Sequence, residues 1–273
     1  MSAPRPVGAP PPDRRAAAAP LDLRMANAWP AVEVEEHAGW RFRWSDGVTR
    51  RACSVLAIGA DEQLVELVAL AEAFYARRGA ATTVQVSTAS APAALAPFLQ
   101  QRGYTAEART FVARAASDRV AAATEPGEWT TTIEDHITDA WFATYWSVES
   151  ARGRSDHQAD VCRESMLAPA YPALFVAARA GDEVVASGQI VIEDGWAGIQ
   201  CMATRSAARR RGAATAVLHR LACEALAAGV ANLYLAVVAD NAAACVLYGA
   251  AGFTATHEYC YYARPPVEGG RAR

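Results

Sequence analysis

The sequence contains no lysine: all 26 of its basic residues are arginine. Chemistry that needs an amine side chain, such as Schiff-base catalysis or a nucleotide-binding loop centred on lysine, is therefore excluded. Abundant alanine accompanies this bias, and the two together are typical of a GC-rich genome. The net charge of −3 at pH 7 leaves no basic excess, so a large nucleic-acid-binding surface is not expected.

Paired cysteines, clustered histidines and long apolar runs are also missing. The six cysteines form no CxxC pair and the five histidines stand apart, so neither a disulfide framework nor a metal site is predicted. No apolar run approaches the roughly 20 residues that cross a bilayer. We therefore expect a cytoplasmic protein with reduced thiols, no metal and no membrane partner.

The chain has ample material for a core. Hydrophobic residues make up 52% of its 273 residues, which is typical of a globular protein and allows one large domain or two modest ones. Residues 1–24 are the exception, because alanine, proline and arginine dominate there, and we predict a disordered tail. A second, short flexible tail is predicted at 266–273.

Two units of α/β class are predicted between these tails, at 25–115 and 129–265, joined by a polar linker at 116–128. In the first unit, the hydrophobic pattern predicts strands at 32–36, 40–44, 53–58, 82–86 and 108–113, and helices at 62–78 and 91–102. In the second unit, it predicts helices at 133–150, 159–167, 213–228 and 241–251, and strands at 174–178, 184–192, 196–202 and 232–238.

The two units repeat one order of elements: strand, helix, strand, helix and a closing glycine. Counting back from the closing glycine, Leu99 in the first unit stands where the second has Tyr248. At the start of the preceding helix, Glu62 stands opposite Gly212, and a carboxylate there would repel a phosphate. The first unit is therefore predicted to be a scaffold that has lost the chemistry of the second.

The turn Arg209-Arg210-Arg211-Gly212-Ala213-Ala214 lies between a predicted strand and a predicted helix. Amides at a helix start are unpaired, and the helix dipole favours negative charge there. Glycine and alanine let a pyrophosphate approach closely, and arginine adds charge-assisted contacts. A solvated basic turn is the alternative interpretation of this turn taken alone.

This turn resembles the R/Q-x-x-G-x-G/A motif of the GCN5-related N-acetyltransferases (the GNAT superfamily), with Arg209, Gly212 and Ala214 at the marked positions. Further along, the stretch from Asn241 to Phe253 is similar to the N-x-x-A-x-x-L-Y-x-x-x-G-F pattern of that family. Two motifs in this order are far more specific than one. Two residues depart from the family pattern without removing an amide: Ser206 and Arg210.

The resemblance implies two GNAT-like domains, each with a central, mostly antiparallel sheet flanked by helices, and a sheet that is splayed at the acyl-CoA site of the second copy. It also implies acetyl transfer from acetyl-CoA to an amine. Backbone groups of Met202, Ala203 and Thr204 would pair with the pantetheine arm like an added strand. Tyr248 would protonate the leaving thiolate as general acid, although it also fits a core tyrosine. Asn241 would cap a helix and, as in the family, could also contact the cofactor. The pyrophosphate would lie on the amides of Arg209, Arg210, Arg211, Gly212, Ala213, Ala214 and Thr215.

The general base stays unassigned. The strand segment 197–201, where many relatives carry a glutamate, has no carboxylate. Cys201 could accept the acyl group, but a strand cysteine without a histidine partner is usually inert packing. Four residues could act through water or could be surface residues: Glu193, Asp194, His257 and Glu258. Three aromatics could line the acceptor pocket or form core: Trp141, Tyr145 and Trp146.

The leading hypothesis is an acetyl-CoA-dependent N-acetyltransferase of tandem GNAT layout that acts on a primary amine of a small molecule or a peptide. A non-catalytic acyl-CoA-binding or regulatory module is the alternative, motivated by the missing base. A dinucleotide-binding oxidoreductase is excluded because no GxGxxG follows a first strand. Neither the acceptor nor the oligomeric state is predicted.

Overall fold

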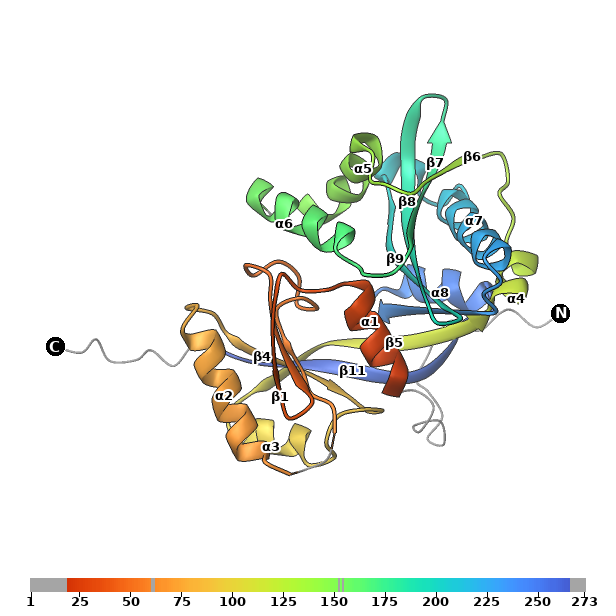
Figure 1. The fold of residues 1–273 in the computed structure, drawn as a ribbon. Coiled ribbons are helices and arrows are strands. Elements are labelled where there is room, and N and C mark those ends of the chain that lie inside the picture. Colours follow the sequence, from red (N-terminus) through yellow and green to blue (C-terminus); the bar gives the residue numbers. More distant parts are fainter. Residues whose placement is uncertain (1–18, 60–61, 152, 154, 266–273) are drawn as a thin grey trace.

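One sheet runs through both halves of the chain (Figure 1). The computed structural model describes residues 19–59, 62–151, 153 and 155–265, and within them the strands take the order β1-β2-β3-β4-β11-β5-β10-β9-β8-β7-β6. The strands are β1 (Glu33–His37), β2 (Trp40–Trp44), β3 (Val55–Leu56), β4 (Thr82–Ser87), β5 (Thr105–Ala116), β6 (Thr130–Glu134), β7 (Ala173–Ala180), β8 (Glu183–Glu193), β9 (Trp196–Thr204), β10 (Asn232–Val238) and β11 (Thr254–Arg264).

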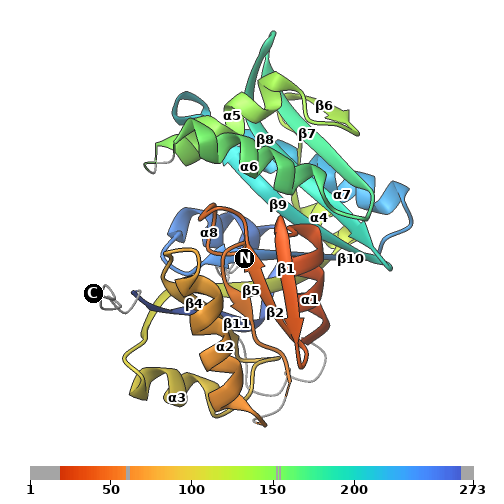
Figure 2. The same cartoon turned by 60° about the vertical axis from the view of Figure 1, so that its left-hand side comes forward.

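Helices cover both faces of this sheet. Figure 2 shows α5 and α6 on one face of the upper strands, whereas α7 packs on the other face, against β7, β8 and β9. In the part of the chain that the structure describes, no helix is both long and apolar enough to span a membrane. The helices are α1 (Ala19–Ala28), α2 (Leu64–Ala76), α3 (Leu95–Gln101), α4 (Ser117–Ala123), α5 (Asp139–Ser150), α6 (Asp156–Leu167), α7 (Ala213–Ala227) and α8 (Ala242–Ala250).

Each half contains one parallel pair of strands connected through a helix, as the repeated element order predicts. β3 pairs with β4 across α2, and β9 pairs with β10 across α7. A helix suits this position because the chain must cross back before it can start a parallel strand. Apolar residues at helical spacing hold both helices on the sheet, with Leu67 and Ala71 buried in α2 and Val217 and Leu221 buried in α7. The predicted α/β class is confirmed.

The two halves exchange strands in the middle of the sheet. β5, from the first half, pairs along the whole of β10 and also pairs with β11, so it lies between two strands of the second half. β11 in turn pairs with β4 of the first half from Tyr259 to Arg264. The predicted boundary at 116–128 therefore separates two stretches of sequence, but the sheet crosses it without interruption.

The predicted end of the N-terminal tail at residue 24 is wrong, because α1 begins at Ala19. Leu21 and Met25 are buried against Val112 of β5, in a cluster that covers the centre of the sheet. This helix contributes few large apolar groups, and the face of the sheet against which it packs cannot be recognised from the sequence. Residues 1–18 of the predicted tail, and the predicted tail at 266–273, lie outside the described residues.

Two predictions beside the linker are also wrong. Residues 117–123 form α4, whose Val120 is fully buried and which packs on α7. The helix predicted from residue 133 begins at 139, where the side chain of Thr138 accepts a hydrogen bond from Trp141 N. Residues 130–134 instead form the edge strand β6, paired with β7. Both errors concern segments whose conformation is set by contacts with distant parts of the chain.

Candidate active site

β9 and β10 separate halfway along their length. Their parallel pairing runs from Trp196 and Asn232 to Ile199 and Leu235, and it stops there although β9 continues to Thr204. The last part of β9 therefore has no strand partner on the side that faces β10. An exposed strand edge of this kind can bind an extended polar chain through backbone hydrogen bonds.

A β-bulge in β9 lies where the two strands separate. β9 has one residue more than β8 between the pairs made by Ser187 and Gln189, and Cys201 takes a φ of 56°. A bulge shifts the side-chain alternation of its strand. Accordingly, Ile199 packs with the core on the α7 face, whereas Cys201 packs with α5 and α6 on the opposite face.

The start of α7 lies at this opening and carries no side-chain cap. Gly212, with a φ of 85°, takes a left-handed conformation that glycine adopts without strain. The first hydrogen bond of the helix joins Ala216 N to Gly212 O at 2.9 Å, and the first turn contains no acidic residue. Unpaired amides and the positive end of the helix dipole therefore meet here, which favours an anion.

The three arginines before α7 divide into two groups. Arg209 and Arg210 line the cleft beside this helix, and Arg209 Nε donates to Thr204 O at 3.2 Å. The Arg211 guanidinium instead lies 5.2 Å from the centroid of the Trp129 ring, whose Nε1 donates to Arg211 O at 2.7 Å. The structure therefore does not bring the Arg211 side chain into the cleft with its two neighbours.

Tyr248 lines the same cleft from α8. Its side chain is 7% exposed and packs edge-on against Phe253, with ring centroids 5.9 Å apart. Burial raises the pKa of the Tyr248 phenol, with a further contribution from the Cys245 thiol. The phenol therefore stays protonated at neutral pH and can donate a proton or a hydrogen bond.

Asn241 begins α8 in the predicted capping position. Its side-chain oxygen accepts a hydrogen bond from Ala244 N at 3.2 Å, which satisfies one of the free amides of the helix start. The same residue lines the cleft. Asn241 thus caps α8, the helix that carries Tyr248.

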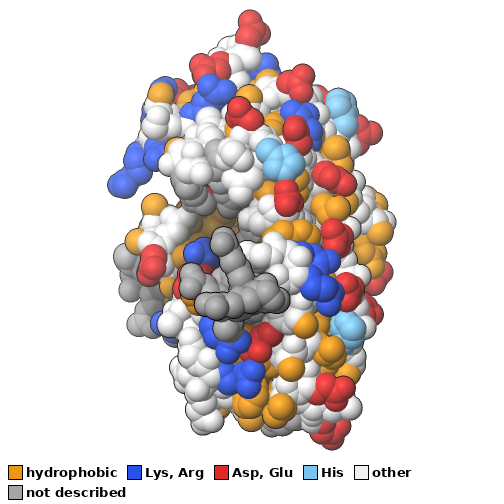
Figure 3. All heavy atoms as spheres, turned by 90° about the vertical axis from the view of Figure 1, so that its left-hand side faces the viewer, with side chains coloured by type: hydrophobic (Ala, Val, Ile, Leu, Met, Phe, Trp, Pro, Cys, Tyr) orange, Lys and Arg blue, Asp and Glu red, His pale blue; other side chains and the backbone are white. Residues whose placement is uncertain are grey.

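These elements surround a cleft of about 830 Å³, a volume that suits a cofactor-sized molecule. Figure 3 shows this side of the molecule hollowed between its upper and lower parts. The cleft brings together eleven of the predicted site residues: Met202, Ala203, Thr204, Arg209, Arg210, Gly212, Ala213, Ala214, Thr215, Asn241 and Tyr248.

Sequence reasoning missed several residues of this cleft. Ala244 and Leu247 stand at marked positions of the N-x-x-A-x-x-L-Y-x-x-x-G-F pattern, on the Asn241 and Tyr248 side of α8, so that motif could have found them. Val148 comes from α5, far away in the sequence, and no local signal marks it. The other missed lining residues are Ala208, Val238, Asp240 and Ala243.

Known proteins share this sequence pattern and this fold. The model of the acetyltransferase (GNAT) family matches residues 133–253, the stretch that contains the split strands, the uncapped helix and Tyr248. Residues 133–253 form a GNAT acetyltransferase domain. A Bacillus subtilis (strain 168) protein described as an uncharacterized N-acetyltransferase, YobR, is 26% identical over 242 residues, which cover 88% of this chain and 96% of that protein.

Solved structures extend the likeness beyond the GNAT domain to the whole chain. A GCN5-related N-acetyltransferase from Kribbella flavida aligns with a TM-score of 0.65 at 15% identity, covering 92% of this chain and 96% of its own. A tandem GNAT protein from the clavulanic acid biosynthesis pathway aligns with a TM-score of 0.63 at 13% identity, covering 96% and 90%. At these identities the likeness shows the fold, which is a tandem GNAT fold.

The structure describes all four candidate bases and places none of them at the cleft. Glu193 and Asp194 lie at the turn between β8 and β9, at the end of β9 opposite to the split. His257 is buried in β11 with its Nε2 3.0 Å from a carboxylate oxygen of Asp22. Glu258 forms an ion pair with an arginine of β5 at 2.6 Å. The side chains of His257 and Glu258 are therefore held by contacts within the fold.

The remaining sequence candidates have mainly packing roles. Cys201 is buried, and burial raises the pKa of its thiol well above the ordinary value, so a nucleophilic thiolate is not formed. Trp141 belongs to the core, where its Nε1 donates to a backbone carbonyl of β7 at 2.8 Å. Tyr145 is buried beside it, whereas Trp146 is half-buried at the outer side of α5.

Proposed function

We propose that the protein is an N-acetyltransferase that moves the acetyl group of acetyl-CoA directly to a primary amine of a small molecule or a peptide. One observation carries this proposal. The cleft joins an unpaired strand edge, a set of free helix amides and a buried, protonated phenol within one space. Acyl-CoA offers a matching sequence of groups: an amide-bearing arm, a pyrophosphate and a thioester.

The phosphate end of the donor would bind at the start of α7. Backbone N–H groups there are uncapped, and Arg209 and Arg210 add two positive charges beside them. The pantetheine amides would pair with the backbone of β9 beyond the point where β10 separates from it. This arrangement would bring the thioester toward Tyr248, which lines the same cleft.

In the reaction, the amine nitrogen attacks the thioester carbonyl carbon, the carbon–sulfur bond breaks, and the sulfur takes up a proton. Tyr248 would supply that proton from its hydroxyl group. Burial raises the pKa of the phenol, so Tyr248 would keep its proton until negative charge develops on the leaving sulfur in the same apolar surroundings, and the phenolate would then regain a proton from solvent. The amine loses its own proton to a base that is not identified.

Replacement of Tyr248 by phenylalanine tests this role. The rate of free-thiol release from acetyl-CoA, measured over a panel of aminoglycosides, polyamines, amino acids and peptides, should fall about 100-fold or more for Tyr248→Phe. Acetyl-CoA affinity, measured by isothermal titration, should be retained because the hydroxyl is needed in the transition state and not for binding.

Tyr234→Phe provides the matched control. The Tyr234 hydroxyl is buried outside the cleft and has no hydrogen-bond partner among the described residues, so its removal should change the rate by less than about two-fold. Equal rates for wild type and Tyr248→Phe would remove Tyr248 from the acid role. Tight acetyl-CoA binding without thiol release for any amine would favour the alternative, a non-catalytic acyl-CoA-binding module.

A further inference from the structure

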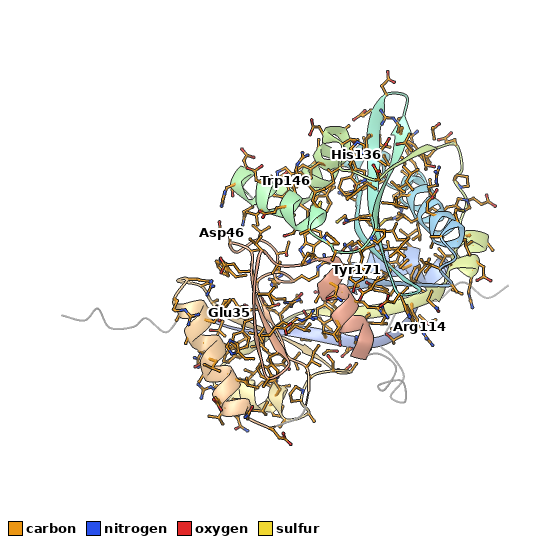
Figure 4. All side chains as sticks on the ribbon, in the orientation of Figure 1. Glu35, Asp46, Arg114, His136, Trp146 and Tyr171 are labelled. Atoms are coloured by element: carbon orange, nitrogen blue, oxygen red, sulfur yellow. The ribbon has the colours of Figure 1, made fainter. Side chains whose placement is uncertain are left out.

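The loop between β2 and β3 reaches from the first half of the chain to the GNAT domain. Val48 and Ala52 of this loop are buried in the cluster formed by α5 and α6. Asp46 Oδ2 lies 2.5 Å from Nε2 of His157 in α6. Figure 4 shows Asp46 between the two parts of the molecule, on the side of Trp146. The loop is therefore fixed beside α5 by contacts at several points.

Arg51 in this loop is half-buried and has little to bind within the protein. One of its terminal nitrogens donates to Gln200 Oε1 at 3.3 Å, and its guanidinium lies 4.8 Å from the centroid of the Trp29 ring. No carboxylate of the described residues forms an ion pair with it. Arg43, in the adjoining strand, differs, because it donates three hydrogen bonds of 2.8 to 2.9 Å to Ser54 and Gln85.

A donor beside Arg51 lacks an acceptor altogether. Trp29 is fully buried, and its Nε1 has no hydrogen-bond partner among the described residues. A shielded charge or donor without a partner destabilises the fold, so such groups are normally paired. An arginine without a carboxylate partner beside an unpaired indole N–H therefore indicates a place that an anion completes.

The position of Arg51 relates it to the proposed reaction. Gln200, its hydrogen-bond partner, directly follows the last residue of β9 that pairs with β10 and directly precedes the bulge at Cys201. Trp29, over which the Arg51 guanidinium lies, belongs together with Cys201 to the cluster of α5 and α6, so Arg51 approaches this part of β9 on the face opposite to α7.

The planar guanidinium of arginine matches the two oxygens of a carboxylate. We propose that Arg51 binds a carboxylate of the acyl acceptor, so that the acceptor is an amine that also carries a carboxylate, such as an amino acid. This inference rests on the proposed N-acetyl transfer. The carboxylate takes the place of the missing partner of Arg51 and holds the amine at the inner end of the split, on the side facing α5.

Matched acceptor pairs test the inference in the full-length protein. Thiol release is measured with amino acids and with the corresponding amino acid amides, which keep the amine and lose the carboxylate charge. Wild type should prefer the acids by about 10- to 100-fold in kcat/KM, as expected for a charged hydrogen-bonded contact. Arg51→Gln should abolish this preference and leave acetyl-CoA affinity unchanged, whereas Arg51→Lys should retain part of it.

Arg114→Gln is the control for charge alone. Arg114 is an exposed arginine of β5, and Figure 4 shows it at the opposite side of the molecule from Asp46. Its replacement removes one positive charge and should leave the preference for acids within about two-fold of wild type. A preference for acids that persists in Arg51→Gln, or equal rates for acids and amides in wild type, would overturn the inference.

A binding measurement separates this inference from the proposed function. Binding of N-acetylglycine, a product of the expected class, is measured by titration calorimetry with wild type and Arg51→Gln. Binding that requires Arg51, without acyl transfer to any amine, would support the carboxylate site and overturn the proposed function. Acyl transfer to amines without carboxylate preference would overturn the carboxylate site alone. Neither binding nor transfer would overturn both.

Discussion

The helix after the parallel strand pair carries Tyr248 in the second half of the chain and Leu99 in the first. Tyr248 lines a cleft, whereas Leu99 is fully buried in an apolar cluster between α2 and α3. The preceding turns correspond as well, but one residue later than predicted: Gln63, and not Glu62, stands opposite Gly212, and both take a left-handed conformation directly before a helix. The two halves therefore share a backbone frame and differ in the side chains that fill it.

This difference shows that the frame and the site are separable. The left-handed turn and the parallel crossover stabilise either half, since both serve to place a helix on a sheet. A phosphate-binding turn needs more, namely free amides without a carboxylate nearby. Glu62 lies beside the turn of the first half, and the arginines at 209 and 210 lie beside the turn of the second. We expect the proposed chemistry to depend on these few differences.

The largest expected effect comes from separating the two halves. A fragment of residues 117–265 lacks β5, which lies between β10 and β11, and should not form a stable native state. Far-UV circular dichroism during urea unfolding measures this, and full-length protein should show one cooperative transition. A fragment that unfolds cooperatively and binds acetyl-CoA as the full chain does would mean that the halves are independent.

An intermediate effect is expected from matched exchanges at the two helix starts. Gly212→Ala places a Cβ at a φ of 85°, which should destabilise the turn by about 1–2 kcal/mol and weaken acetyl-CoA binding by about 10-fold. Gln63→Gly, at a φ of 64°, relieves the same conformational cost in the first half and should leave acetyl-CoA binding unchanged. Titration calorimetry and urea unfolding compare the two variants.

The added Cβ at Gly212 has space, because its nearest neighbour, Trp129 Nε1, would lie at 3.8 Å. A loss of affinity in Gly212→Ala would therefore report the backbone conformation of the turn and not a steric clash. Equal effects of both exchanges on acetyl-CoA binding would contradict the assignment of the donor site to the second half.

The smallest expected effect concerns pH. Burial raises the pKa of Tyr248 above its ordinary value, so the phenol keeps its proton to at least about pH 10. The rate of thiol release should rise as the acceptor amine loses its proton and should then stay level up to that pH. A fall in rate centred below about pH 9 would indicate a different acid. Tyr248→Phe should lower the rate and keep the shape of the profile.

Local physics explains why most residues of the cleft could be predicted from the sequence. The amides before α7, the left-handed Gly212 and the cap at Asn241 depend on residues within one turn of each other, so a short motif specifies them. Tyr248 follows from helical spacing after that cap. The sequence alone therefore determined the repeated frame and most of the residues that line the cleft.

Contacts between distant segments decided the rest. Arg51 and Gln200 lie 149 residues apart, and only the folded sheet brings them together beside the bulge in β9. The exchange of β5 and β11, the burial of α1 and the contribution of Val148 to the cleft have the same origin. Sequence patterns record which face of an element is apolar, and they do not record which other element covers it. The tertiary structure alone therefore decided the surroundings of Arg51, where we propose that the acceptor binds.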